Sequence, residues 1–317
     1  MNQLTFRNGD KLAAIGLGTW KSEPGEVYAA VRAAIKAGYT HIDCAWIYQN
    51  EAEIGNAFRD AFADGDITRE ELFVTSKLWN SFHAPEDVEK GIKETLNALQ
   101  LDYLDLYLMH WPIAHKHGVT FSEDASGFAS LDEYPLIDTW KAMEQLVEKG
   151  LAKHIGVSNF NIPKLQLLID KGSIIPEMNQ VESHPLLAQL ELVEFCKQHK
   201  ILYTAYSPLG SRDRAAGMKG SDEPDLFEIP QIRAIAKNHD VHPAQILIKW
   251  AEARGTAVIP KSVNPERLKA NLSSAEIPLS ELEMMEINQL DKGYRFLNGK
   301  FWEREGGYYT ADSIWNN

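Results

Sequence analysis

The chain has 317 residues, of which 44% are hydrophobic and 24% are charged, so it can bury a large core and lacks the composition of a disordered protein. The chain contains 32 Lys and Arg residues and 45 Asp and Glu residues. The resulting net charge of −13 argues against broad binding of nucleic acid or anionic membranes. No apolar run reaches the roughly 18 residues of a spanning helix, and no secretory leader opens the chain, so we expect a cytoplasmic protein.

The first predicted element is a tight hairpin over residues 4–12. Asn8-Gly9 stands there between alternating residues, which is a strong signal for a two-residue turn. We expect this hairpin to cap one end of the fold.

Short β-branched runs then alternate eight times with longer amphipathic stretches. Strands are predicted at 15–18, 41–45, 73–78, 104–110, 154–158, 177–181, 202–207 and 257–261. Helices are predicted at 25–37, 51–62, 85–99, 136–149, 162–170, 188–199, 243–254 and 265–271. This rhythm predicts an α/β fold, a closed (β/α)8 TIM barrel, and no break in composition divides residues 1–317 into further domains.

Three long segments interrupt the rhythm of short loops, at 112–135, 208–229 and 291–317. Long loops in a compact domain are commonly functional, and barrel enzymes place their active sites at the C-terminal ends of the strands. The two cysteines, Cys44 and Cys196, are far apart and form neither a disulfide framework nor a zinc motif.

Ionisable residues end three successive predicted strands. Strand alternation places Asp43, Lys77 and His110 on faces directed toward the barrel mouth, and Tyr48 follows Asp43 closely enough to turn back over it. An ammonium near a phenol lowers its pKa from about 10, which suits Tyr48 as a proton donor beside Lys77. Asp43 would fix the ammonium, and His110 would bind a substrate oxygen. Each residue alone also has a structural interpretation, as an ion pair, a rim aromatic or a strand-end histidine.

Ordered motifs along residues 3–300 give the chain a resemblance to a known family. They are Gly16-Leu17-Gly18-Thr19-Trp20, His41-Ile42-Asp43-Cys44-Ala45, Tyr48-Gln49-Asn50-Glu51, Thr75-Ser76-Lys77-Leu78-Trp79, Met109-His110-Trp111-Pro112, Gly156-Val157-Ser158-Asn159-Phe160, Asn179-Gln180-Val181-Glu182, Ala205-Tyr206-Ser207-Pro208-Leu209-Gly210 and Ile259-Pro260-Lys261-Ser262. The chain resembles the aldo-keto reductases, near their aldose and aldehyde reductase branch. So many motifs in order make coincidence very unlikely.

The resemblance implies roles for the residues at the barrel mouth. Tyr48 would be the general acid, tuned by Lys77 and Asp43, with His110 orienting the carbonyl. Nicotinamide would stack on Tyr206, with its carboxamide held by Ser158, Asn159 and Gln180. The other implied cofactor residues are Gly18, Thr19, Trp20, Lys21, Asp43, Ser207, Leu209, Ser211, Asp213, Lys261, Ser262, Asn264, Arg267 and Asn271. The substrate pocket would be lined by Trp20, Ile47, Tyr48, Trp79, His110 and Trp111. Phe121, Phe301 and Trp302 lie in the long loop and the tail, the segments that set substrate choice in relatives.

The expected cofactor is NADP(H), with NAD(H) as a weaker alternative. Gly16-Leu17-Gly18 lacks the third glycine of a dinucleotide-binding fingerprint, so other residues must bind the cofactor. Lys261 and Arg267 form a local basic site on an acidic chain, and the resemblance places it at the 2′-phosphate. Ala270 stands where related reductases often carry Glu, which leaves dual cofactor use open. Lys21 and Asp213 match positions that join over the pyrophosphate, and we expect a mobile clasp there.

The sequence therefore predicts NADPH-dependent reduction of aldehydes, with open-chain aldoses as one candidate class and generic aldehyde detoxification as another. One alternative is a catalytically silent NADP(H)-binding sensor or structural subunit. A second is a metal-dependent hydrolase built on His41, Asp43, His110 and His184, although no metal motif stands at a strand end. We expect a monomer that binds a small carbonyl substrate, with no metal, nucleic acid or membrane partner.

Overall fold

The computed structural model describes residues 2–214, 218–220 and 222–316, so residues 215–217, 221 and 317 of the predicted long segments lie outside the described residues. The predicted hairpin is present: β1 (Gln3–Thr5) pairs antiparallel with β2 (Lys11–Ala13). Gly9 in the turn has φ of 98°, a conformation that favours glycine.

Eight parallel strands form one sheet that closes on itself. Each strand pairs with the next of these eight in the chain, in the order β3 (Leu17–Gly18), β4 (His41–Asp43), β5 (Phe73–Leu78), β6 (Leu104–Met109), β9 (Ala152–Ser158), β10 (Met178–Glu182), β11 (Leu202–Tyr206) and β12 (Ala257–Val258). Parallel bridges from Ile15 to Val258 and from Gly18 to Lys261 join the last strand to the first. The predicted barrel is therefore confirmed, although the end strands at 15–18 and 257–261 are shorter than predicted, with isolated bridges in place of continuous ladders.

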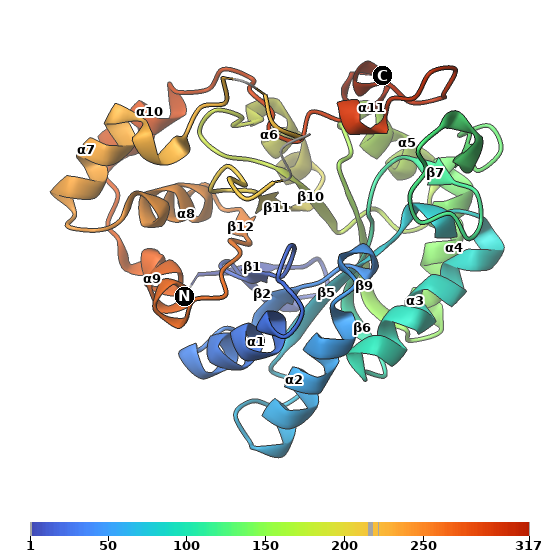
Figure 1. The fold of residues 1–317 in the computed structure, drawn as a ribbon, viewed down its shortest axis with the longest axis horizontal. Coiled ribbons are helices and arrows are strands. Elements are labelled where there is room, and N and C mark those ends of the chain that lie inside the picture. Colours follow the sequence, from blue (N-terminus) through green and yellow to red (C-terminus); the bar gives the residue numbers. More distant parts are fainter. Residues whose placement is uncertain (1, 215–217, 221, 317) are drawn as a thin grey trace.

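Eight helices match the predicted ones to within a few residues and surround the strands (Figure 1). They are α1 (Glu26–Ala37), α2 (Glu51–Ala63), α3 (Pro85–Leu99), α4 (Leu136–Glu148), α5 (Ile162–Lys171), α6 (Leu190–Gln198), α8 (Pro243–Ala253) and α9 (Pro265–Ser273). The predicted helix at 188–199 was too long, because residues before Leu190 form a turn in which Gln189 has φ of 50°.

Besides several 3-10 helices, the described residues form three α-helices and two short strands that were not predicted. They are the helices α7 (Pro230–Asn238), α10 (Glu281–Asn288) and α11 (Ala311–Trp315) and the two-residue strands β7 (Ala114–His115) and β8 (Phe128–Ala129). α10 buries a single residue, Ile287, so it has no apolar stripe for periodicity to detect. β7 and β8 make a short antiparallel pair inside the segment 112–135, which we had expected to be a loop.

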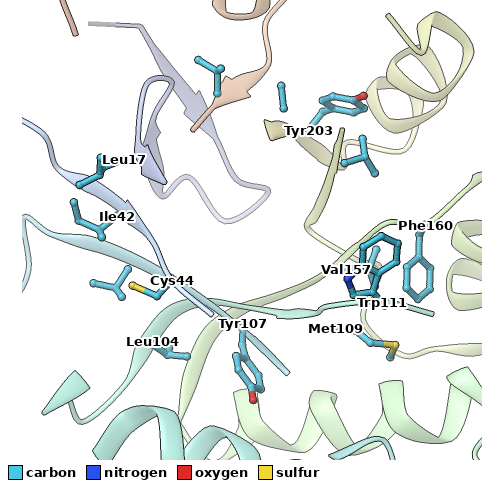
Figure 2. Close-up of a cluster of buried hydrophobic side chains, with 14 of the residues drawn as sticks. Leu17, Ile42, Cys44, Leu104, Tyr107, Met109, Trp111, Val157, Phe160 and Tyr203 are labelled. Atoms are coloured by element: carbon cyan, nitrogen blue, oxygen red, sulfur yellow. The ribbon is translucent and has the colours of Figure 1, made fainter. Parts of the chain in front are cut away.

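The core has two parts, one outside the strands and one inside the barrel. Between strands and helices lies a layer of buried apolar side chains, part of which Figure 2 shows, with Tyr107 pointing from β6 toward the helices. Inside the barrel, Leu106, Leu108 and Met178 pack with Phe6 and Leu12 of the hairpin. These apolar side chains fill the end of the barrel that the hairpin covers. The polar side chains lie at the opposite end, where the C-termini of the strands meet. No helix within the described residues combines the length and apolar character needed to cross a membrane.

Candidate active site

The predicted catalytic side chains meet at the C-terminal end of the barrel. Lys77 Nζ on β5 lies 2.6 Å from Asp43 Oδ2 on β4 and 2.8 Å from the carbonyl oxygen of Cys44. It also lies 3.5 Å from the hydroxyl of Tyr48, which ends a 3-10 helix (Trp46–Tyr48) after β4. The Lys77 and Asp43 side chains are 1% and 2% exposed, so a fully buried ion pair stands directly beside the phenol.

The Asp43 carboxylate is fixed from both sides of the barrel. Its second oxygen, Oδ1, accepts a 2.7 Å hydrogen bond from Gln180 Nε2 on β10, on the opposite side of the barrel. The Thr19 hydroxyl donates to the Asp43 carbonyl at 2.8 Å. A charged group held by partners on several strands keeps its geometry, which is what a positioned proton donor beside it requires.

The environment of Tyr48 differs from the expectation. Burial of the phenol, together with the nearby Asp43 carboxylate, raises the pKa of Tyr48 well above its ordinary value. The predicted net lowering of this pKa is therefore wrong, because burial of the phenol and the charge of Asp43 outweigh the effect of the nearby ammonium. Tyr48 consequently keeps its proton throughout the neutral range.

His110 follows β6 with its ring 6.0 Å from the Tyr48 ring and 5.3 Å from the Trp79 ring, between centroids. Burial and the charge of Lys77 hold the pKa of His110 well below its ordinary value, so the imidazole is neutral. Its Nδ1 has no hydrogen-bond partner among the described residues. A neutral imidazole beside the phenol can donate one hydrogen bond to a substrate oxygen from its other nitrogen.

One cavity of about 1120 Å³ opens above this group. Every cofactor and substrate residue named from the sequence lines it, while Lys77 lies behind the wall and acts through Asp43 and Tyr48. The cavity also has walls that were not predicted, including Met218, Phe227, His242, Gln245, Leu297 and Arg304. His242 and Gln245 carry only the helix-start signal of a capping box, which does not distinguish a cap from a ligand contact.

Ser158, Asn159, Gln180 and Tyr206 form one hydrogen-bonded group in the cavity wall. Asn159 Nδ2 donates to the His110 carbonyl at 2.9 Å and to Ser158 Oγ at 3.1 Å, and the Tyr206 hydroxyl donates to Asn159 Oδ1 at 2.7 Å. Asn159 Oδ1 keeps one lone pair, and the Gln180 side chain keeps one N–H and its Oε1 in addition to the bond from Nε2 to Asp43. These free positions can hold a carboxamide, as the nicotinamide interpretation requires.

The other end of the cavity carries two cations, Lys261 and Arg267, beside the carboxylates of Asp213 and Glu266, and Lys261 Nζ lies 3.8 Å from Asp213 Oδ2. The exposed Arg267 guanidinium makes no ion pair with the residues that the structure describes, and Lys261 is half-buried close to it along the chain. Both flank the start of α9, where Asn264 Oδ1 accepts from the backbone N–H groups of Glu266 and Arg267 at 3.0 Å. Two cations at a helix N-terminus suit a phosphate group on an otherwise acidic protein.

The predicted clasp residues are in contact. Lys21 Nζ lies 2.5 Å from Asp213 Oδ1 and 2.9 Å from Ser211 Oγ, joining the loop after β3 to the loop after β11. Lys21, Ser207 and Ser211 have positive φ values of 61°, 48° and 48° although none is glycine. Such backbone strain, gathered around one cavity, is common at functional sites.

The residues of the metal hypothesis do not converge. In the described part of the chain, no three His, Cys, Asp or Glu side chains are grouped to hold a metal ion. His41 Nδ1 lies 3.2 Å from the Ala13 carbonyl oxygen, and His184 Nε2 lies 2.9 Å from Glu182 Oε1. His110 points a neutral ring toward Tyr48 instead.

Comparison with known proteins agrees with the fold and the motifs. The sequence model of the Aldo/keto reductase family matches residues 14–292. An aldo/keto reductase from Synechocystis sp. is 47% identical over 316 residues, covering 100% of this chain and 97% of the relative. Aldo-keto reductase family 1 member A1 from Gallus gallus is 49% identical, covering 95% and 94%. The solved structure of the aldose reductase from Schistosoma japonicum has a TM-score of 0.87 and 42% identity, covering 95% and 96%.

Proposed function

The chain belongs to the aldo/keto reductase family, an assignment that makes it an oxidoreductase, and we propose that it reduces aldehydes to alcohols with NADPH, Tyr48 acting as the general acid. Open-chain aldoses are candidate substrates. The observation that carries the proposal is the Tyr48 hydroxyl, 3.5 Å from the buried Lys77–Asp43 pair and beside neutral His110 in one cavity.

The proton chemistry follows from these surroundings. NADPH, when bound, supplies the hydride that reaches the carbonyl carbon. The carbonyl oxygen then gains negative charge, and an alkoxide is a far stronger base than a phenolate, so Tyr48 gives up its proton despite its high pKa. The resulting phenolate lies next to the Lys77 ammonium, which stabilises it as it forms.

His110 and the aromatic walls would place the substrate. The neutral imidazole can donate to the carbonyl oxygen without competing for the proton that Tyr48 delivers. Trp20, Trp79 and Trp111 with Ile47 line the cavity and favour an aldehyde with an apolar or amphipathic body.

The cofactor assignment rests on the two ends of the cavity. Ser158, Asn159 and Gln180 would hold the nicotinamide carboxamide, and Lys261 with Arg267 would bind the phosphate that distinguishes NADPH from NADH. We further propose that the protein works as a cytoplasmic monomer on a small carbonyl compound, without a nucleic acid, membrane or metal partner.

A label-transfer experiment tests the proposal. The protein is incubated with NADPH carrying deuterium on the transferable C4 position and with a panel of aldehydes, and the alcohol is analysed by mass spectrometry. We expect one deuterium on the carbinol carbon and one NADP⁺ per alcohol. Tight NADPH binding without turnover of any aldehyde would instead favour the silent sensor or structural subunit.

A further inference from the structure

Glu182 ends β10 two positions beyond Gln180. Its buried carboxylate binds the backbone of the long segment that begins at residue 291, here called the C-terminal segment. Oε1 accepts from the backbone N–H of Phe296 at 2.6 Å, and Oε2 accepts from that of Leu297 at 2.7 Å. His184 Nε2 lies 2.9 Å from Oε1, and both side chains are 0% exposed. A fully buried carboxylate thus joins the barrel to residues more than a hundred positions later in the chain.

The carboxylate is suited to this role because it stays ionised. Burial by itself raises the pKa of Glu182, but the hydrogen bond and charge of His184, the charge of Arg295 and the Leu297 N–H outweigh it, and the pKa lies below its ordinary value. Hydrogen bonds to an ionised acceptor are stronger than those to a neutral one. The bonds from the Phe296 and Leu297 N–H groups to the Glu182 carboxylate therefore hold this part of the backbone strongly.

The anchored residues lead directly into the wall of the cavity. Leu297 lines the cavity, and the 3-10 helix that follows (Lys300–Trp302) supplies Phe301 and Trp302. The Trp302 ring lies 5.9 Å from the Trp79 ring and 5.6 Å from the Trp111 ring, so the tail completes an aromatic enclosure begun by the barrel loops. Ring contacts with His115 and Phe128 also hold Trp302, and Phe296 and Leu297 fix the start of the segment that leads to it.

The far end of the segment, red in Figure 1, is held separately at α11 beside α5. Lys164 Nζ donates to the carbonyl oxygens of Ser313 and Ile314, and the Tyr309 hydroxyl donates to the Ala129 carbonyl. Loss of the Glu182 contacts therefore frees the Phe296 and Leu297 amides, while the end of the chain stays attached and the Asn298 carbonyl still accepts from Trp315 Nε1 at 2.7 Å.

We propose that Glu182 is a positioning residue for substrate selection: its carboxylate holds Phe296 and Leu297 so that Phe301 and Trp302 enclose aldehydes with an aromatic body. This inference rests on the proposed function. Small aldehydes that reach only Tyr48 and His110 do not depend on this contact, whereas aromatic aldehydes do.

The test uses Glu182→Gln and Glu182→Asp with a matched control. The Glu182→Gln change keeps the side-chain volume but replaces one acceptor oxygen with an NH2 group that faces an N–H donor; Glu182→Asp keeps the charge on a shorter arm. Glu144 is the control site, since its buried carboxylate also accepts from two successive backbone N–H groups, those of Ser173 and Ile174, at 2.6 and 2.7 Å, and it lies outside the cavity lining.

Hydrogen exchange at the Phe296 and Leu297 amides is measured first, with no substrate present. We expect strong protection in the native chain and at least tenfold faster exchange in both Glu182 variants, with no change in Glu144→Gln. Unprotected amides in the native chain, or unchanged exchange in Glu182→Asp, would overturn the contact itself whatever the enzyme's activity.

Steady-state kinetics with NADPH then separate specificity from general damage. For 4-nitrobenzaldehyde we expect KM to rise about tenfold in the Glu182 variants with kcat within threefold, while KM for glyceraldehyde stays within twofold. Equal losses for both aldehydes, matched by Glu144→Gln, would reduce Glu182 to a structural residue. A native chain that turns over neither aldehyde would contradict the proposed function. The hydrogen-exchange rates would still test whether Glu182 binds the Phe296 and Leu297 amides.

Discussion

Glu51 opens α2 behind the catalytic group, and its protonation links the fold to pH. Its side chain is buried and accepts a 2.6 Å hydrogen bond from the Ser76 hydroxyl. Burial raises the pKa of Glu51 to about 7 from an ordinary value of 4.5, and the Ser76 hydrogen bond and the charge of Lys77 offset only part of this shift. The folded chain therefore keeps a proton that the unfolded chain releases between these pH values.

Replacing Glu51 with Gln should remove this pH dependence. In the native chain the stabilisation from the bound proton is complete below pH 4.5 and is lost as pH rises through 7, a change of up to about 3 kcal/mol. Urea unfolding of both proteins at pH 5 and pH 8 measures the difference. We expect the free energy of unfolding of the native protein to fall relative to Glu51→Gln between these pH values; parallel behaviour of the two would refute the buried, protonated carboxyl.

The sequence predicted which way individual side chains of the site point, but not how burial shifts their pKa values. Alternation along β4 and β5 places Asp43 and Lys77 on inward faces, and the 2.6 Å contact between them follows. The pKa of Tyr48 depends on how completely neighbouring elements bury the phenol, and no local pattern contains that information. The contact from Glu182 to the tail escaped prediction for the same reason, since its partners are distant in the chain.

At the scale of elements, the loops after β3 and β11 meet through Lys21 and Asp213, and this contact should govern how long the cofactor stays bound. The pair is partly exposed, with side chains 22% and 53% accessible, so its strength is that of a surface ion pair reinforced by Ser211. Loops that cover a cofactor often set the rate of its release.

We expect Lys21→Met and Asp213→Asn to speed NADPH release about three- to tenfold, with the rate of hydride transfer in a single turnover unchanged. Stopped-flow displacement of bound NADPH by excess NADP⁺ gives the release rate. Lys149→Met is the control, because it removes another exposed ion pair, that with Glu89, far from the cavity lining. Release rates equal to those of this control would show that the clasp has no such role.

An apolar period accounts for most of the predicted helices, but α7 was missed although it buries Ile232, Ile235 and Ala236 along one face. α3 buries a continuous stripe that includes Val88, Ile92 and Leu99, and its predicted bounds match the observed ones. α10 and the β7–β8 pair are short and gain their structure from contacts with the rest of the molecule, which single-sequence patterns do not report.

At the scale of the whole molecule, the net charge of −13 makes the two cations of the cavity, Lys261 and Arg267, stand out. The proposed dinucleotide would approach an acidic protein against its overall electrostatic field, so its binding would depend on local cations such as the exposed Arg267. The net charge predicts that any anionic ligand needs a local basic site, and the fold places Lys261 and Arg267 together at the start of α9 as the candidate.

Arg267→Leu should weaken NADPH binding selectively. We expect the Kd of NADPH to rise about tenfold, the Kd of NADH to change less than twofold, and the salt dependence of NADPH binding to decrease. Fluorescence titration measures all three. Arg233→Leu serves as the control, since this exposed arginine on α7 pairs with Glu228 and lies outside the cavity lining. An equal loss for both cofactors would place the 2′-phosphate elsewhere.

The most direct measurement of the central claim is the initial rate of NADPH oxidation with glyceraldehyde, made in parallel on the native protein and on Tyr48→Phe. The variant removes the proposed proton donor and leaves Lys77, Asp43 and Arg267 in place. We expect the native protein to turn over and kcat of the variant to fall by about a thousandfold, with the Kd of NADPH within twofold. Full activity in Tyr48→Phe would contradict the assignment of Tyr48 as the general acid.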